Sequence, residues 1–311
     1  MPRIEIIILA PLIAALLISL VPPLDIRTRS AMSMVFQLGW LGLIIFLGIQ
    51  GSLGRVHCGL LLAQTLVTAG VRFRKNTPSL LPPMSWLLTG IATAAILTPD
   101  LSLLLILAYL HIAFLLFVTS QTGGIYKGSA TYESFLFFVT IDLAAYFSIS
   151  LPYLWTYWIL ILPGLARILF PLTAPYARSL FVNCPTEIML LMLSGAVPVG
   201  IAWLLRIPLP CPYLELLEIL SFGSSFFAAI LFLIEKSRRQ RAIYLFMTQS
   251  ALCARLILGS GSLHVQLFAG LLCLVALANT ALWLYLIDYP RVRILNTTLA
   301  AATLFLLVYR P

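Results

Sequence analysis

The sequence predicts an all-α polytopic membrane protein with about twelve transmembrane helices. Of 311 residues, 61% are apolar and only 9% are charged, and the mean hydropathy is +1.06. A soluble domain carries charge on about a quarter of its residues, so this composition excludes a soluble fold. Long apolar stretches also recur along the chain, close to the roughly 20 residues that cross a bilayer as a helix.

The predicted helices are separated by proline and glycine, which end helices and form turns. We interpret 5–21 as a retained first span because Pro22 and Pro23 follow it, with no small-residue signal-cleavage site. The remaining spans are predicted at 31–50, 56–71, 82–98, 101–119, 133–151, 153–172, 186–205, 213–234, 242–259, 264–287 and 293–309. The short stretch 56–71 is the least secure, and without it the count is eleven. We expect one integral membrane domain over 1–311.

The distribution of basic residues orients these helices. Apart from Arg167 and Arg255, the nineteen lysines and arginines lie in loops or at the ends of spans, thirteen on one side of the membrane and four on the other. The positive-inside rule places the richer side in the cytoplasm. With twelve spans the N-terminus lies outside the cytoplasm, and with eleven spans it lies inside the cytoplasm. The net charge of +9 therefore reflects topology, and we expect no nucleic-acid partner.

The most basic cytoplasmic loop contains Lys236, Arg238, Arg239 and Arg241. Topology alone explains these charges, but they also suit contact with anionic lipid or with a partner protein. Both readings stay open on the sequence alone.

Ionisable groups inside a membrane are costly, so each is a candidate functional residue. The candidates for an ion path are Tyr109, His111, Asp142, Arg167, Arg255 and His264. Asp142 lies in the middle of a predicted span, and histidine can titrate near neutral pH. Asp142, His111 and Arg167, with water, can form a polar axis. Alternatively, Asp142 and Arg167 form a buried pair that locks two helices together.

Pro171 and Pro175 predict a discontinuous helix or, alternatively, the end of a span at the membrane interface. The five cysteines show no paired spacing, and Glu215 and Glu218 lack the His or Cys neighbours that a metal would want. We therefore expect no metal site, no cofactor and no catalytic residue.

Several segments resemble one transporter family. Residues 164–175 read Gly-Leu-Ala-Arg-Ile-Leu-Phe-Pro-Leu-Thr-Ala-Pro, and 200–206 read Gly-Ile-Ala-Trp-Leu-Leu-Arg. A basic loop then precedes Ala242 and Tyr244, and Asp100-Leu101 opens an earlier helix. Over 85–288 the chain resembles the antiporter-like subunits shared by respiratory complex I, membrane-bound hydrogenases and multi-subunit sodium/proton antiporters.

The resemblance implies that the chain is a shortened subunit of a proton- or sodium-translocating complex. Its expected partners are the other membrane subunits of that complex and the lipid bilayer. The family places a glutamate where this chain has Tyr109 and a lysine close to Arg167, while its second lysine falls near Pro198. Arginine stays charged in proteins, so the usual relay is missing and the role is structural or a partial ion path.

The alternative function is an independent small-solute transporter or channel. We expect no catalysis by the chain alone, although the resemblance is compatible with a subunit of a complex I-like oxidoreductase or hydrogenase. The expected location is a bacterial inner membrane.

Overall fold

The computed structural model describes residues 2–22, 26–69, 81–121, 129–151, 156–168, 170, 186–207 and 211–258. These residues form α1 (Pro2–Leu20), α2 (Ile26–Ile49), α3 (Arg55–Ala69), α4 (Leu81–Leu97), α5 (Leu101–Gln121), α6 (Ser129–Ser148), α7 (Thr156–Arg167), α9 (Thr186–Leu204), α10 (Cys211–Ile234) and α11 (Arg238–Leu258). Each matches one of the first ten predicted spans, so the all-α prediction is confirmed. The predicted spans 264–287 and 293–309 lie outside the described residues.

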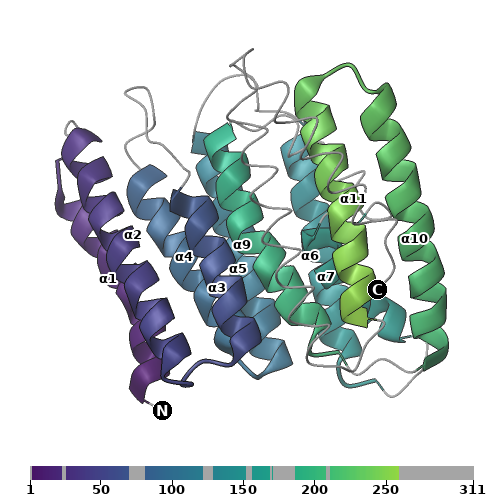
Figure 1. Ribbon diagram of the computed structural model, residues 1–311, viewed down its shortest axis with the longest axis horizontal. Helices are drawn as coiled ribbons and strands as arrows, with labels where there is room; N and C mark the ends of the chain where they lie inside the picture. Colours follow the sequence, from purple (N-terminus) through teal and green to yellow (C-terminus); the bar gives the residue numbers. More distant parts are fainter. Residues whose placement is uncertain are drawn as a thin grey trace.

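The helices stand side by side as one bundle and alternate in direction (Figure 1). The short helix α3 lies within the bundle, in contact with α2, α4 and α9. The N-terminus is at the lower edge in Figure 1, whereas the α10–α11 connection is at the upper edge. Because the basic α10–α11 loop is predicted to be cytoplasmic, this arrangement favours counting α3 as a span, with the N-terminus on the opposite side of the membrane.

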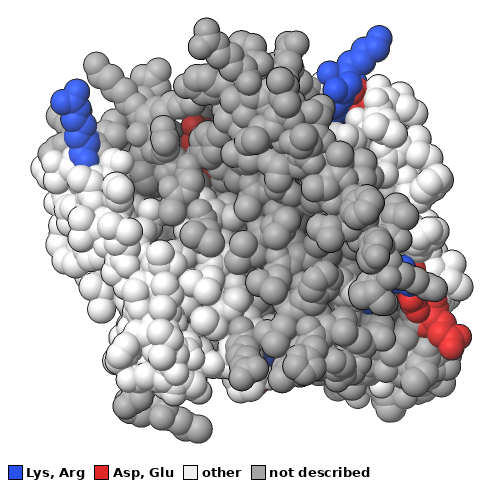
Figure 2. Space-filling model, in the orientation of Figure 1, with Lys and Arg blue, Asp and Glu red and all other residues white. Residues whose placement is uncertain are grey.

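The visible Lys and Arg side chains support this orientation. Figure 2 shows the two most prominent of them at the upper rim, over the start of α2 and over the α10–α11 connection, at the end away from the N-terminus, with smaller blue areas lower down. The exposed basic residues of these two segments include Arg27 and Lys236. Charges separated by more than 200 residues in sequence therefore gather at one end of the bundle, as the positive-inside rule requires.

Helix α9 occupies the centre of the bundle. It packs against α3, α4, α5, α7 and α11, and every residue from Ile188 to Leu204 is buried. Its sequence is apolar and contains glycines at 195 and 200, which allow neighbouring backbones to approach closely. A helix that is apolar on all sides belongs in the interior, so α9 forms the core on which the other helices pack.

The outer helices present apolar side chains to their surroundings. Leu16 on α1, Val35 on α2 and Phe226 on α10 are each more than 60% exposed. Among the described residues, four helices are long and apolar enough to cross a membrane: Arg27–Ile49, Leu101–Val118, Glu187–Leu204 and Glu215–Ile234. This surface suits a hydrocarbon environment, and the protein is an integral membrane protein.

Polar side chains complete several helix ends. The Asp100 carboxylate Oδ1 accepts hydrogen bonds from the backbone N–H groups of Ser102 (2.7 Å) and Leu103 (3.3 Å), and so caps the start of α5. Arg29 donates to the carbonyl of Val21 after α1. Arg206 donates to the carbonyl of Ile96 on α4 at 2.7 Å. These contacts occupy backbone groups that a helix terminus otherwise leaves unpaired.

Candidate functional site: a buried ion pair beside the central helix

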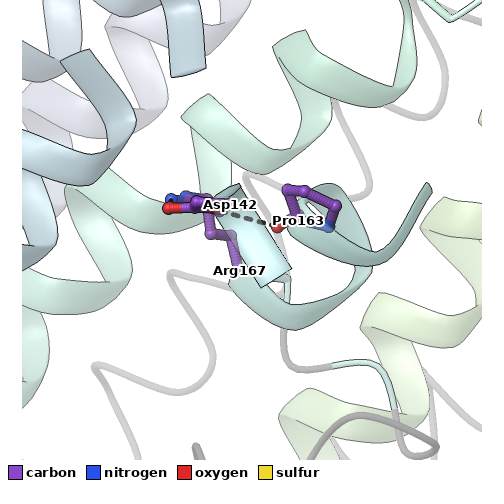
Figure 3. Close-up of polar contacts among 3 residues, drawn as sticks. All are labelled: Asp142, Pro163 and Arg167. Carbon is purple, nitrogen blue, oxygen red and sulfur yellow. Dashed lines mark hydrogen bonds and ion pairs between the residues drawn. The ribbon is translucent and has the colours of Figure 1, made fainter. Parts of the chain in front are cut away.

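The most enclosed charges in the described part of the chain are Asp142 on α6 and Arg167 on α7. Arg167 Nη1 donates to Asp142 Oδ1 at 2.8 Å, and Nη2 donates to Oδ2 at 2.5 Å. Their side chains are only 2% and 3% exposed. The Arg167 side chain folds back along α7, so Nη1 also donates to the carbonyl of Pro163 at 3.1 Å (Figure 3). Both carboxylate oxygens are therefore engaged by one arginine fork.

The position of this pair within the membrane follows from helix length. Helix α7 has 12 residues, which corresponds to about 18 Å, whereas the hydrocarbon core is about 30 Å thick. It begins at the end of the bundle where α6 finishes, and Arg167 is its last residue. Arg167 therefore lies inside the apolar layer, where an unpaired charge is expensive and a paired one is tolerated.

Glycines bring α7 against the central helix. A Cβ on Gly200 of α9 would lie 2.9 Å from both Arg167 Cβ and the carbonyl oxygen of Gly164. A Cβ on Gly164 would lie 2.7 Å from Leu204 Cγ. The Trp203 indole N–H on α9 donates to the carbonyl of Leu160 on α7 at 2.6 Å. Close backbone contact and a buried hydrogen bond thus fix the helix that carries Arg167.

His111 on α5 faces the same region. It is 1% exposed. A Cβ on Gly195 of α9 would lie 2.1 Å from His111 Nε2, so the ring occupies the space that this glycine leaves. Nε2 has no hydrogen-bond partner among the described residues. The structure therefore places His111 and the Asp142–Arg167 pair beside α9, and an ion path through these residues stays a prediction.

Tyr109 does not join this cluster. It precedes His111 by two residues, which places it about 200° around α5 at 3.6 residues per turn. Its side chain is only partly buried. Tyr109, which stands where the resembling family has a membrane glutamate, thus lies on the side of α5 away from the ion pair.

Arg255 takes part in a separate ion pair. On α11, its Nη2 and Nε donate to Glu218 Oε1 on α10, at 2.6 and 3.1 Å. The side chains are 26% and 45% exposed, and α10 and α11 pack closely against each other. The sequence indicated Arg255 as an ion-path candidate and did not predict its pairing with Glu218. The observed contact joins α11 to the outer helix α10.

Replacement of Arg255 with glutamine is expected to have a small effect on stability. A partly exposed ion pair is worth at most about 1 kcal/mol because water screens it. We therefore expect R255Q to lower the free energy of unfolding by less than about 1 kcal/mol, measured by denaturant titration in detergent micelles. Glu218→Gln should cost the same, and a much larger loss in either variant would contradict this peripheral role.

Two of the remaining predicted features lie outside the described residues. They are His264 and the predicted break at Pro171 and Pro175. Helix α7 ends at Arg167, shortly before the first of these prolines. The described residues contain no group of three or more His, Cys, Asp or Glu side chains that could hold a metal ion.

Sequence analysis missed the uncharged polar residues of the interior. The Gln64 side-chain amide on α3 donates to the carbonyl of Thr89 on α4 at 3.1 Å, and Thr93 Oγ1 lies 3.5 Å from Gln64 Oε1. Gln249 on α11 is 1% exposed, and in the part of the chain that the structure describes neither end of its amide has a partner. A glutamine inside an apolar span could have indicated these contacts from the sequence, because a buried amide needs hydrogen-bond partners.

The fold and the site define a class: a polytopic helical membrane protein whose central helix is flanked by a buried ion pair. No protein-family model matches the sequence, and no curated protein does.

Solved structures provide the comparison. The fold is similar to a chain of respiratory complex I from Thermus thermophilus with bound aureothin, with a TM-score of 0.73 and 14% identity over 92% of this chain and 70% of that one. It is also similar to a chain of the membrane-bound sulfane sulfur reductase, an archaeal respiratory membrane complex, with a TM-score of 0.73 and 13% identity over 90% of this chain and 55% of that one. The resemblance predicted from the sequence is confirmed at the level of the fold.

Proposed function

We propose that this chain is a membrane subunit of a larger ion-translocating complex, in which the Asp142–Arg167 pair fixes α6 and α7. Support for the assembly comes from the fold, which chains of two respiratory membrane complexes share. Support for the fixed role comes from one observation: a single arginine fork engages both oxygens of Asp142.

The chemistry of the pair favours a structural role over proton transfer. A relay group must bind and release a proton as its surroundings change, whereas arginine stays protonated in proteins. Asp142 accepts two charge-assisted hydrogen bonds from Arg167, and such bonds are roughly twice as strong as neutral ones. We therefore assign the pair to helix positioning, and we expect any ion movement in the complex to depend on other residues or other subunits.

Co-purification tests the assembly. An affinity-tagged copy of the chain, expressed in its native host and solubilised in mild detergent, should elute with other membrane proteins as a particle several times its own mass. Mass spectrometry would identify those partners. A protein that elutes alone and transports a solute by itself in proteoliposomes would contradict this proposal and support the independent carrier.

Arg167→Lys tests the positioning role. Lysine has one ammonium in place of a planar fork, so it cannot reproduce the two parallel bonds to Asp142. We expect R167K to lower the thermal stability of the protein and to leave passive proton flux in proteoliposomes at the wild-type rate. The matched control is Arg255→Lys, the same exchange in the partly exposed pair. A proton leak specific to R167K would instead show that the site can pass protons.

A further inference from the structure

The Arg167 guanidinium has an aromatic ring over its flat face. Its Cζ lies 5.8 Å from the centre of the Phe138 ring on α6, and Phe138 is 2% exposed. The N–H groups of a guanidinium lie in its plane, and there they donate to Asp142 and to the Pro163 carbonyl. The face of the guanidinium donates no hydrogen bond, so Phe138 contacts Arg167 on a side that neither of these acceptors uses.

Helix α6 supplies the ring and the carboxylate together. Phe138 and Asp142 are four residues apart, so they lie one turn from each other on the same face of α6. A cation within about 6 Å of a ring centre is attracted by the negative face of the ring, and this attraction is stronger where water is absent. The side chains of the ion pair are only 2% and 3% exposed, so bulk water does not screen the contact.

The contact distinguishes arginine from lysine. A planar guanidinium can donate two parallel bonds to a carboxylate and stack on a ring at the same time, whereas the lysine ammonium is compact and has no plane to stack. The stem of Arg167 is confined as well, because a Cβ on Gly200 of α9 would lie 2.9 Å from Arg167 Cβ. The stem, the edge and one face of this side chain are thus each contacted by a different group.

We propose that Phe138 is a positioning residue for the Asp142–Arg167 pair. The ring holds the guanidinium in the orientation that gives both bonds to Asp142, and it makes the site specific for arginine. This proposal rests on the function proposed above, in which the pair fixes α6 and α7. It adds a third side chain to that pair, placed one turn before Asp142 on the same helix.

A series of fluorinated phenylalanines at position 138 tests the contact. Fluorine withdraws negative charge from the face of the ring and changes the size of the ring little, so each added fluorine weakens the attraction for Arg167. We expect the midpoint of thermal unfolding of the full chain in detergent micelles to fall stepwise, by about 2–4 °C over the series. Fluorination also makes a ring more apolar, so burial alone would predict the opposite sign.

Two references separate the contact from packing. In the double variant Asp142→Leu/Arg167→Met the cation is absent, so the same series at position 138 should produce no fall. The matched control is the same series at Phe246 on α11, a ring that is 1% exposed. In addition, Phe138→Leu removes the aromatic face and should reduce the further loss caused by R167K, because residues in contact are not additive.

The outcomes distinguish this proposal from the function on which it rests. If the series has no effect at position 138 while R167K still destabilises the protein, the role of Phe138 is overturned and the helix-fixing role of the pair is not. An equal fall in the double variant or at Phe246 would show a packing effect and would also overturn it. If the series lowers the midpoint as expected but R167K is as stable as the wild type, the contact is supported and the helix-fixing role fails.

Discussion

Asp142→Leu is expected to destabilise the protein by about 3–5 kcal/mol, because it leaves Arg167 charged and enclosed without its counter-ion. Leucine supplies bulk in the space of the carboxylate, so the loss reports mainly on the unpaired guanidinium. The free energy of unfolding, measured by denaturant titration in mixed micelles, would show the effect. Lower yield of folded protein in the membrane should accompany it.

The double variant Asp142→Leu/Arg167→Met provides the internal control. Replacing a buried ion pair with apolar residues of similar volume is often neutral or stabilising, so the second substitution should recover most of the loss. The partly exposed Arg255–Glu218 pair supplies the external control, since removal of one partner there should cost less than about 1 kcal/mol. If D142L alone is as mild as that, the Asp142–Arg167 pair does not stabilise the bundle.

Gly200→Ala is expected to give the second large effect, a loss of about 1–3 kcal/mol from overpacking. The added methyl would meet the Cβ of Arg167 and the backbone carbonyl of Gly164, and no side-chain rotation can move either group away. Helices α7 and α9 would have to separate by several tenths of an ångström. Thermal unfolding in detergent should show the loss.

Gly39 on α2 supplies a matched control, because nothing lies within 4 Å of a Cβ built at that position. Alanine favours a helix by up to about 1 kcal/mol over glycine, so Gly39→Ala should be neutral or slightly stabilising. Equal losses at the two positions would mean that the effect has a cause other than contact between α7 and α9.

The sequence predicted the helices better than it predicted their contacts. Apolar runs bounded by proline and glycine predicted all ten helices of the described residues, because a span of this kind is a local property. The ends were less accurate: 153–172 was predicted where α7 covers Thr156–Arg167. Where a helix ends inside the apolar layer depends on which groups hydrogen-bond to the backbone at its terminus. Hydropathy carries no information about those groups.

The candidate site was predicted in part. Buried charge is so costly that Asp142 and Arg167 could be selected from sequence, and mutual pairing was one of the two readings offered. The fit of His111 against Gly195 and the bond from Trp203 to Leu160 depend on how α9 crosses α5 and α7. Such crossings arise only when distant segments pack, so a single sequence could not predict them.

The enclosed position of α9 has a consequence for biosynthesis. Among the described helices that pack closely against it, α3, α4, α5 and α7 precede it in the chain and α11 follows. Since a nascent chain emerges with its N-terminal part first, α9 leaves the ribosome when most of its groove already exists. The α10–α11 hairpin can then close the remaining side as a unit, because its two members contact each other far more than they contact α9. Truncation before residue 211 should therefore yield an inserted but protease-sensitive intermediate.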